Sequence, residues 1–324
     1  MMNILVTGGA GFIGSHIVER LTEERPAARA SPAGLIRVVD NLSTGHLENI
    51  QPFLEQVEFI RGDLLDDGIR ASAVQGIDVI LHQAAIPSVP RSVDKPVESH
   101  CNNAHVTLLL LDSARRQGVK RFVFAGSSSA YGDSETLPKV ETMVPQPLSP
   151  YAASKVAGEY YCSVFSRCYG LDTAVLRYFN VFGPRQDPTS QYSGVIAKFC
   201  MAYCRNQPIT IFGDGSQSRD FTFISNVVEA NLLAARSSTK LDGQVFNVGC
   251  GERYSLNEMV RVLNELTGKA VTPAYAAERC GDVKHSLADI ARARATLGYE
   301  PAVRFRQGLS QTLEWYRTTL GEVQ

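Results

Sequence analysis

Short apolar runs of strand length alternate with helix-like segments through the first half of the chain. The strand-like runs are Asn3–Thr7, Leu35–Asp40, Val57–Arg61, Val79–His82, Arg121–Gly126 and Thr173–Tyr178. Helical patterns separate them and are clearest in Val97–Gln117 and Tyr151–Tyr169. Because alternating strands and helices build a parallel sheet with right-handed crossovers, the pattern predicts an α/β fold with a Rossmann-like doubly wound parallel sheet.

The second half of the chain has a different character. Turn residues accumulate in Gly183–Pro188 and Gly213–Ser216, which is typical of a smaller mixed α/β domain that caps the sheet. A helix over Asn226–Ala235 and a strand over Val245–Val248 are expected to return to the first domain. The predicted division is a first domain over 1–180, a return segment near 225–250 and a second domain over 181–324.

Composition excludes several classes of partner. A formal net charge of −1 gives no electrostatic footprint for nucleic acid or an anionic membrane. The N-terminus enters the first strand at once and the longest apolar runs, such as Val106–Leu111, are too short to cross a bilayer, so neither a signal peptide nor a membrane span is expected. Seven scattered cysteines, an odd number, indicate reduced thiols and a cytoplasmic location. Cys200 and Cys204 lie one helical turn apart, but no nearby His or Cys completes a metal site.

The first strand runs into a glycine-rich turn over Thr7–Gly14, and helical spacing continues through Ile13–Leu21. Gly8, Gly11 and Gly14 let the chain turn tightly and bring N–H groups close to a pyrophosphate, while the helix N-terminus adds partial positive charge. A turn chosen only for close helix–strand packing is the alternative. The strand before it, the helix after it and an acidic residue on the next strand favour a dinucleotide site.

That acidic residue is Asp40, which ends the second strand. A carboxylate there accepts both hydroxyls of an adenosine ribose and repels a 2′-phosphate, which favours NAD over NADP. A turn role is the alternative, because Asp40–Gly45 is also typical turn sequence. Arg37 lies on the same strand and is expected to point away from the ribose.

Tyr151 and Lys155 are four residues apart in a helical segment, so their side chains face the same way. A free phenol, with a pKa near ~10, is a poor base at neutral pH, but an adjacent ammonium and the positive nicotinamide ring favour the phenolate. Ser127 closes the fifth strand, where its hydroxyl can bond a reacting oxygen and relay a proton to Tyr151. Helix-surface packing for the pair, and turn capping for Ser128 and Ser129, are the alternatives.

These residues resemble the extended short-chain dehydrogenase/reductase family, in its UDP-hexose 4-epimerase branch, and among these enzymes the bacterial UDP-N-acetylglucosamine 4-epimerases most. The resemblance covers nearly the whole chain. It is carried by Gly8–Gly14, His82–Ala85, Ser127–Gly132, Ser149–Lys155, Arg177–Gly183, Ser218–Phe221 and Gly281–Ser286. It implies that the first domain binds NAD, that the second domain binds the UDP part of a UDP-sugar substrate, and that Ser127, Tyr151 and Lys155 form the catalytic set.

Carried over by position, the resemblance implies two groups of binding residues. The NAD site would comprise Gly8, Gly11, Phe12, Ile13, Gly14, Asp40, Asn41, Ser43, Thr44, Gly45, Asp63, Leu64, Gln83, Ala84, Ala85, Asn102, Tyr151, Lys155 and Tyr178. The UDP-sugar site would comprise Ser127, Ser128, Ser129, Tyr151, Asn180, Gly194, Val195, Thr210, Phe212, Arg219, Arg279, Asp282 and Ser286. Arg219 and Arg279 would hold phosphate oxygens and Asp282 the uridine ribose, with solvated surface charge as the alternative for each arginine.

The reaction implied by the resemblance is oxidation of the sugar C4 hydroxyl, rotation of the 4-keto sugar about its diphosphate, and reduction from the other face. Related dehydratases and decarboxylases carry a carboxylic acid directly after the Ser or Thr, where this chain has Ser128 and Ser129. A UDP-uronic acid 4-epimerase remains an alternative, because Arg91, Lys198 and Lys284 could supply a cation for the sugar carboxylate. A non-catalytic NAD-binding scaffold is the other alternative, although such proteins typically lose the Tyr or the Lys.

One position in the sequence, Ser286, bears on which sugar the protein would accept. Relatives restricted to UDP-glucose carry a bulky Tyr where this chain has Ser286, and Gly194 would widen the same wall. The resemblance therefore implies UDP-GlcNAc/UDP-GalNAc interconversion with weaker action on UDP-Glc/UDP-Gal, in a pathway such as surface polysaccharide synthesis. Capping of Leu287–Ile290 is the alternative role for Ser286.

Self-association is also expected. Val97–Gln117 and Tyr151–Tyr169 carry more apolar positions than one side of a sheet can cover. The resemblance implies that these helices pair across a two-fold axis as a four-helix bundle, which predicts a homodimer.

Overall fold

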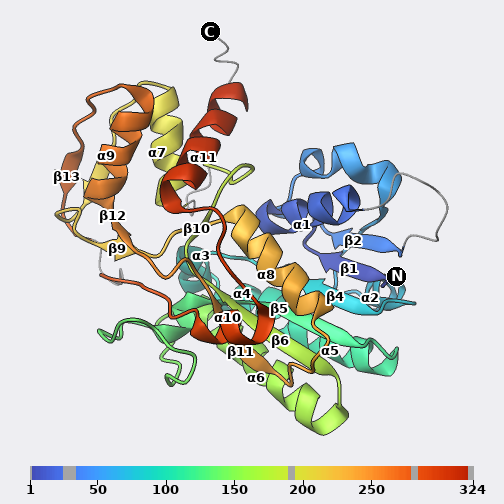
Figure 1. Ribbon diagram of the computed structural model, residues 1–324. Helices are drawn as coiled ribbons and strands as arrows, with labels where there is room; N and C mark the ends of the chain where they lie inside the picture. The colour runs from blue at the N-terminus through green and yellow to red at the C-terminus, as the bar shows by residue number, and fades with distance from the viewer. Residues whose placement is uncertain (1, 25–33, 189–193, 279–283, 320–324) are drawn as a thin grey trace.

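The computed structural model describes residues 2–24, 34–188, 194–278 and 284–319 (Figure 1). Its centre is a parallel sheet of seven strands in the order β11-β6-β5-β4-β1-β2-β3. The strands are β1 (Ile4–Thr7), β2 (Ile36–Asp40), β3 (Glu58–Arg61), β4 (Val79–His82), β5 (Arg121–Ser127), β6 (Asp172–Tyr178) and β11 (Gln244–Val248). The six strands predicted for the first half are present with ends that shift by one residue at most, and the doubly wound α/β fold is confirmed.

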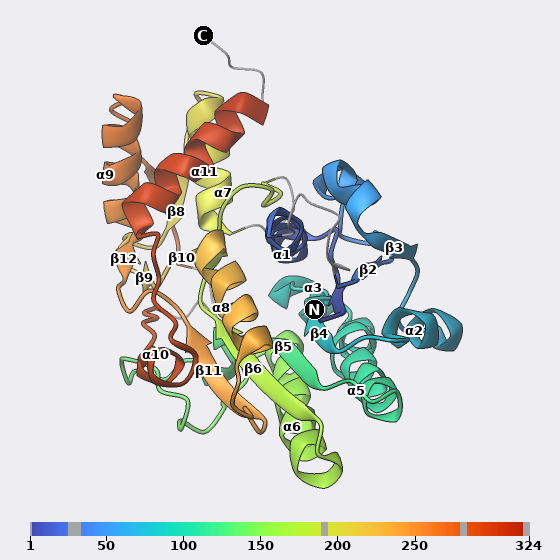
Figure 2. The same ribbon diagram turned by 45° about the vertical axis from the view of Figure 1, so that its right-hand side comes forward.

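Helices cover both faces of this sheet (Figures 1 and 2). Their bounds are α1 (Phe12–Glu23), α2 (Asp67–Val74), α3 (Val89–Asp94), α4 (Pro96–His100), α5 (Val106–Arg116), α6 (Pro150–Tyr169), α7 (Val195–Cys204), α8 (Ile224–Arg236), α9 (Leu256–Thr267), α10 (Ala291–Leu297) and α11 (Phe305–Thr319). On one face α1 packs against α8, and on the other α5 packs between α2 and α6. The strand order reverses at β1, where sheets of this kind bind ligands outside the carboxyl ends of their strands.

Side chains of β5 alternate between two apolar clusters on opposite faces of the sheet. Phe122 and Phe124 belong to the cluster that includes Leu110 of α5 and Phe165 of α6. Val123 belongs to the cluster on the α1 and α8 face. Because both faces are buried, the strands are apolar throughout, which explains why continuous runs marked them in the sequence.

The helix predicted over Val97–Gln117 is present as one continuous helical run over Pro96–Arg116, in which the middle turn is π-helical rather than α-helical. A π-helical segment, η3 (Cys101–His105), separates α4 from α5. Within it the Oδ1 atom of Asn103 accepts a hydrogen bond of 2.8 Å from the backbone N–H of Ile86. A polar side chain is thus turned toward the sheet, and apolar periodicity does not detect such a local widening of the helix.

The second predicted helix is regular and is present as α6. Ser149 caps its start, because its Oγ accepts a hydrogen bond of 3.1 Å from the N–H of Ala152, and Pro150 occupies the first turn. Gly170 ends it in the left-handed conformation with φ of 71°. These caps fix where Tyr151 and Lys155 lie along the helix.

The second half adds helices and small sheets above one end of the large sheet. α7, α9 and α11 form its helical part. Three two-stranded sheets join β7 (Val181–Phe182) to β10 (Thr222–Phe223), β9 (Ser218–Arg219) to β12 (Tyr254–Ser255), and β8 (Thr210–Phe212) to β13 (Ala274–Ala276). The shorter helical turns of the chain are η1 (Leu47–Asn49), η2 (Gln51–Gln56) and η4 (Ser128–Tyr131).

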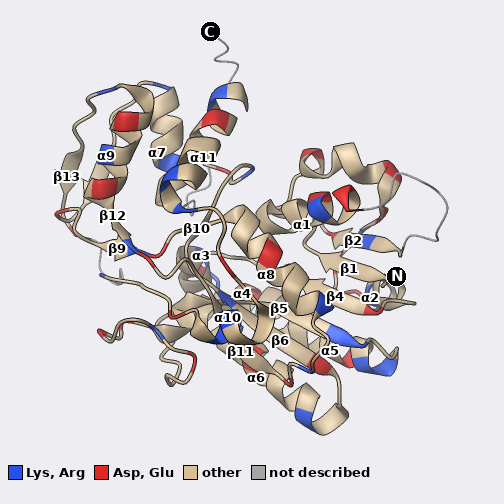
Figure 3. Ribbon diagram, in the orientation of Figure 1, with Lys and Arg blue, Asp and Glu red and all other residues tan. Residues whose placement is uncertain are grey.

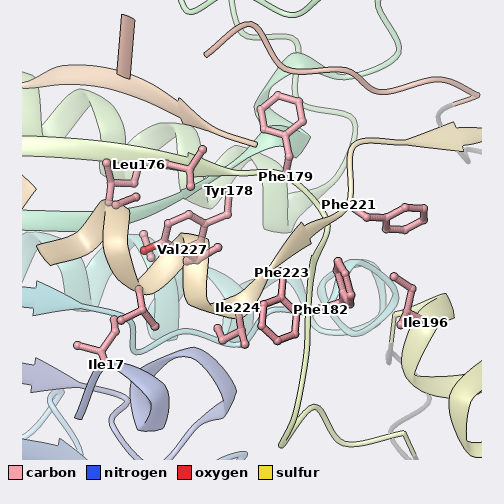
Figure 4. Close-up of a cluster of buried hydrophobic side chains, with 14 of the residues drawn as sticks. Ile17, Leu176, Tyr178, Phe179, Phe182, Ile196, Phe221, Phe223, Ile224 and Val227 are labelled. Carbon is pink, nitrogen blue, oxygen red and sulfur yellow. The ribbon is translucent and has the colours of Figure 1, made fainter. Parts of the chain in front are cut away.

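The chain returns to the large sheet after entering the second half. α8 packs against the sheet, and β11 pairs in parallel with β6 at its edge. A buried apolar cluster spans the two parts, with Ile17 of α1, Val227 of α8, Phe182 of β7 and Ile196 of α7 among its members (Figure 4). The two parts therefore share one core.

Lys and Arg residues and Asp and Glu residues are interspersed over both parts of the molecule (Figure 3). None of the helices within the described residues is long and apolar enough to span a bilayer.

Candidate active site

The structure brings most of the predicted site residues to the carboxyl end of the large sheet. They end or follow β1 (Gly8, Gly11, Phe12, Ile13, Gly14), β2 (Asp40, Asn41, Ser43, Thr44, Gly45), β3 (Asp63, Leu64), β4 (Gln83, Ala84, Ala85), β5 (Ser127, Ser128, Ser129) and β6 (Tyr178, Asn180). Tyr151 and Lys155 reach this end from α6. This carboxyl end of the sheet is therefore the candidate active site.

The glycine turn after β1 folds so tightly that side chains would not fit in it. Gly8 has φ of 64°, and a Cβ on it would lie 2.7 Å from the backbone of Ala84. A Cβ on Gly14 would lie 2.2 Å from the carbonyl oxygen of Gly8. α1 begins directly after Gly11, which has no side chain to cap its first N–H groups. Such a turn at a helix start suits a dinucleotide pyrophosphate.

A second group of predicted residues meets beyond β2 and β3. The Asp40 carboxylate accepts hydrogen bonds from the N–H groups of Ala10 (2.9 Å) and Leu42 (2.8 Å), which oppose the rise in its pKa that burial causes. Asn41 donates to the Asp63 carboxylate at 3.0 Å. These contacts set the Asp40 carboxylate beside the glycine turn, where an adenosine ribose would lie, and the Asp63 carboxylate beside Asn41.

Arg37 points away from this corner, as expected. Its Nη1 donates to the carbonyl oxygen of Ala73 at 3.0 Å, and its Nη2 pairs with Glu58 at 2.9 Å.

The side chain of Leu64 does not face a ligand, because it is buried in the apolar cluster beneath α2 and α5. Only its backbone can therefore face a cofactor.

Tyr178 also has a largely internal side chain. Its ring belongs to the apolar cluster of Figure 4, and its hydroxyl donates within 3.1 Å of Gln83 Oε1 and Asn231 Oδ1. Asn231, on α8, in turn donates to the Tyr178 oxygen at 2.8 Å. Burial raises the pKa of this phenol well above its usual value. Tyr178 therefore fixes Gln83 rather than acting as a base.

Asn103 was missed by the sequence reasoning, which named Asn102 instead. The Asn102 amide donates to the carbonyl oxygen of Glu98 within its own helix, at 2.9 Å. The Asn103 amide donates to Ser154 Oγ at 3.1 Å, and Ser154 donates to the carbonyl oxygen of Tyr151 at 2.7 Å. Asn103 thus links the π-helical segment to the helix that carries Tyr151. An asparagine inside an apolar helical run was the available sequence signal.

His82 forms a second unpredicted link across the site. Its Nδ1 lies 2.7 Å from Thr7 Oγ1, and its Nε2 lies 3.0 Å from Thr107 Oγ1. Thr107 uses its hydroxyl proton on the carbonyl oxygen of Asn103, so His82 must donate from Nε2 and accept at Nδ1. Burial lowers the pKa of His82 to about 3, so the ring stays neutral and serves to join β1, β4 and α5.

Ser127, Tyr151 and Lys155 converge as the sequence predicted. Ser127 Oγ lies 2.7 Å from Ser129 Oγ and accepts from the Ser129 N–H at 3.2 Å, which turns it at the end of β5. Burial raises the pKa of the Tyr151 phenol, and its hydrogen bond with Ser127 opposes that rise. Lys155 lies one turn beyond Tyr151 on α6, and its Nζ donates to the carbonyl oxygen of Ala125 on β5 at 2.9 Å.

Lys155 is a buried ammonium with few partners to stabilise its charge. Burial lowers its pKa to about 8, and the Glu159 carboxylate opposes this fall. Burial therefore acts against both charged forms at this site, the Tyr151 phenolate and the Lys155 ammonium, so each depends on neighbouring groups to hold its charge.

A cavity of about 270 Å³ lies in the second half, beside the ends of β6 and β7. Six predicted residues line it: Asn180, Gly194, Val195, Thr210, Phe212 and Arg219. The lining also includes Val181, Phe182, Gln186, Ile196, Gln217, Phe221 and Leu256, which the sequence reasoning missed because most of them read as core. Arg279 and Asp282 lie outside the described residues. An apolar cavity with a few convergent polar groups suits a small organic ligand.

Ser286 is not among the residues that line this cavity. Its N–H donates to the carbonyl oxygen of Ser218 at 3.0 Å, and Ser218 directly precedes Arg219. Ser286 is buried and does not cap a helix, because α10 begins only at Ala291. The capping alternative is therefore wrong.

The comparisons with known proteins agree with this geometry. The NAD dependent epimerase/dehydratase family model matches residues 4–249. UDP-glucose 4-epimerase of Mycolicibacterium smegmatis is 38% identical over 98% of this chain and 99% of its own length. Among solved structures, UDP-N-acetylglucosamine 4-epimerase from Methanobrevibacter ruminantium has a TM-score of 0.91 and 37% identity, covering 98% of this chain and 99% of that one. UDP-glucuronic acid 4-epimerase from Bacillus cereus, in complex with UDP-glucuronic acid and NAD, has a TM-score of 0.89 and 32% identity over 98% and 100%. The chain therefore belongs to the NAD dependent epimerase/dehydratase family, and its cofactor is NAD.

Proposed function

We propose that the protein is a UDP-sugar 4-epimerase whose preferred pair is UDP-GlcNAc and UDP-GalNAc, with weaker action on UDP-Glc and UDP-Gal. The observation that carries the proposal is the convergence of Ser127, Tyr151 and Lys155 between the glycine turn and the cavity of the second half. In this proposal residues 1–180, with the return segment, hold NAD, and the rest of the chain holds UDP. The relatives named above support the reaction class.

Tyr151 is the acid and base of this reaction. Its phenolate takes the proton of the sugar C4 hydroxyl, which Ser127 orients by a hydrogen bond, and Tyr151 returns the proton after the sugar has turned. The Lys155 ammonium stabilises the phenolate by its charge. The hydride chemistry is supplied by bound NAD, which the glycine turn and Asp40 would hold.

The residues after Ser127 favour epimerisation over elimination. Ser128 and Ser129 carry hydroxyls where an elimination would need a carboxylic acid to protonate the leaving oxygen. The intermediate keto sugar is therefore reduced again rather than dehydrated. Firm anchoring of UDP by the cavity and by Arg219, with looser contacts to the sugar, would allow the sugar to turn.

The direct test is incubation of the purified protein with UDP-GlcNAc, UDP-Glc or UDP-glucuronate, each with and without added NAD. Chromatography should show UDP-GalNAc as the fastest-formed product. Substrate deuterated at sugar C4 should give product that keeps the deuterium at the inverted carbon. Failure to convert any UDP-sugar would remove the catalytic proposal and leave an NAD-binding scaffold.

A UDP-uronic acid 4-epimerase is the second candidate, because the Bacillus cereus enzyme of this class resembles the chain along its length. Arg91 is a weak anchor for a sugar carboxylate, since its Nη2 already pairs with Glu98 Oε1 at 2.6 Å. Lys284 is exposed, and Lys198 is half-buried on α7. Conversion of UDP-glucuronate alone in the assay above would decide for this candidate.

The sugar preference gives a prediction for Ser286. Ser286→Tyr should lower kcat/KM for UDP-GlcNAc by at least about tenfold more than for UDP-Glc, because the ring would fill the space of the acetamido group. Ser286→Ala, which keeps that space, is the matched control and should change the ratio little. Equal losses on both sugars in the Tyr variant would refute the proposed role.

We also propose a homodimer formed through α4, α5 and α6. Val93, Val97, Tyr160 and Val164 have exposed fractions of 64%, 74%, 59% and 46%, and α3 and α4 both pack beside α6. Such apolar side chains on neighbouring helices suit a four-helix bundle with a second copy.

The dimer has its own prediction. Light scattering should give twice the mass of one chain for the wild type and the mass of one chain for Val97→Asp/Val164→Asp, because two buried carboxylates per subunit would oppose association. Val144→Asp, at a 77% exposed residue outside these helices, is the matched control and should leave the dimer intact. A monomeric wild type would contradict the proposal.

A further inference from the structure

Glu159 lies one helical turn beyond Lys155 and is almost completely buried. Its carboxylate accepts hydrogen bonds from Arg177 Nε at 2.9 Å and Nη2 at 2.7 Å. A Cβ on Gly126 would lie 3.2 Å from Glu159 Oε1, so β5 passes directly over the carboxylate. The preceding residue, Ala125, accepts the hydrogen bond from Lys155. The carboxylate and the ammonium thus meet neighbouring residues of β5, immediately before Ser127.

Arg177 also contacts η4, the turn that follows Ser127. Its guanidinium stacks on the ring of Tyr131 at 4.6 Å, and the Tyr131 hydroxyl donates to Asn247 Oδ1 at 2.5 Å. Tyr131 closes η4, the turn that begins directly after Ser127. The pair of Glu159 and Arg177 therefore contacts both elements that carry the proposed catalytic groups.

A purely structural role does not explain a buried ion pair at this place. Removing two charges from water is costly, and apolar side chains of similar size often stabilise a fold equally well. A second pair, half-buried Arg121 with buried Asp172, lies at the opposite ends of the same two strands, β5 and β6. There Asp172 also accepts hydrogen bonds from the N–H groups of Leu241 and Asp242, so that pair has a structural task far from the site.

We propose that Glu159 is a positioning residue that keeps Lys155 charged beside Tyr151, while Arg177 holds the carboxylate in place. The inference rests on the proposed roles of Tyr151 and Lys155. No charged or titratable group nearby replaces Glu159 in this task among the described residues. Those nearby are Tyr151 and Cys162 of α6, His82 of β4, Arg177 of β6 and Tyr131 of η4, and none of them supplies a negative charge near neutral pH. The Glu141 carboxylate acts on Tyr131, but it is not among the groups that shift the pKa of Lys155.

The charge of Glu159 should raise the pKa of Lys155, because a nearby carboxylate stabilises an ammonium. Burial lowers the pKa of Lys155 to about 8, and Glu159 opposes this fall. Burial also raises the pKa of Glu159, but its bidentate contact with a guanidinium opposes that rise and favours the carboxylate. Without this charge Lys155 would lose its proton at lower pH, and the Tyr151 phenolate would lose its stabilising cation.

The test is a titration of Lys155 in the full-length protein with NAD bound. Carbon-13 labelling at the ε position gives signals for eight lysines, and Lys155→Arg identifies the one in question. Glu159→Gln should lower the titration midpoint of Lys155 by on the order of one pH unit, and the alkaline limb of kcat should move the same way. Asp172→Asn is the matched control and should leave both unchanged. An unchanged midpoint in Glu159→Gln would overturn the inference.

Glu159→Gln leaves the Arg177 charge buried without its partner, which can prevent folding. In that case Glu159→Gln/Arg177→Met removes both charges and should lower the midpoint by less than Glu159→Gln, because the opposing positive charge is lost as well; a wild-type midpoint would overturn the inference. The titration needs no turnover. A wild-type protein that converts no UDP-sugar would therefore refute the proposed function while the titration still decides the role of Glu159.

Discussion

Replacement of Tyr151 by Phe should lower kcat for the UDP-sugar by about 10² to 10⁴, because the variant has no group that can take or return the C4 hydroxyl proton. The ring and its packing at the start of α6 are kept, so the fold and the NAD site should change little. NAD affinity measured by calorimetry should stay near the wild-type value. The loss should therefore appear in kcat and not in cofactor binding.

Tyr160→Phe is the control for this experiment. It removes the same hydroxyl from the same helix, but Tyr160 is 59% exposed and faces away from the site. Turnover close to wild type is expected there. Comparable activity in Tyr151→Phe and Tyr160→Phe would refute the acid–base role and leave Tyr151 as a packing residue.

The glycine turn gives the second large effect. Gly14→Ala should weaken NAD binding by about 10- to 100-fold, since its Cβ would lie 2.2 Å from the carbonyl oxygen of Gly8 and the turn would have to open. Gly11→Ala places a Cβ 3.2 Å from the same oxygen, so a small shift should suffice and the loss should be smaller. Calorimetry with NAD measures both variants on one scale.

Circular dichroism and thermal unfolding of the two variants show whether weaker NAD binding comes from a local change in the glycine turn or from loss of the folded structure. Both proteins should keep the helical signal of the wild type. Equal affinities for NAD in Gly14→Ala and Gly11→Ala would show that the close approach of Gly14 to Gly8 does not shape the cofactor site.

The sequence predicted those parts of the fold that depend on local pattern. The six strands of the first half and α6 follow from apolar runs and from the cap at Ser149. Ser127, Tyr151 and Lys155 could be placed together because a parallel sheet brings the ends of all its strands to one edge. Their predicted roles follow from the four-residue spacing of Tyr151 and Lys155, which puts a phenol and an ammonium on one helix face, and from the position of Ser127 at the end of a strand.

Contacts between distant parts of the chain could not be predicted in this way. Tyr131 bonds Asn247, 116 residues later, and Gln83 bonds Asn231, 148 residues later. The π-helical turn around Asn103, whose side chain bonds the backbone of Ile86 in another segment, has no counterpart in the apolar periodicity of the helix. The cavity lining includes Phe182 and Phe221, whose apolar side chains carry no mark that distinguishes a binding wall from a core.

The late arrival of β11 has a consequence during synthesis on the ribosome. β6 is buried along its whole length in the finished protein, yet its partner at the edge, β11, ends only at Val248. Until the nascent chain has passed that residue, β6 presents a row of unpaired N–H and C=O groups at the edge of the sheet, which is a template for aggregation. A slower passage of the ribosome through the codons before Val248 would therefore lengthen the time for which this strand edge is open to another chain.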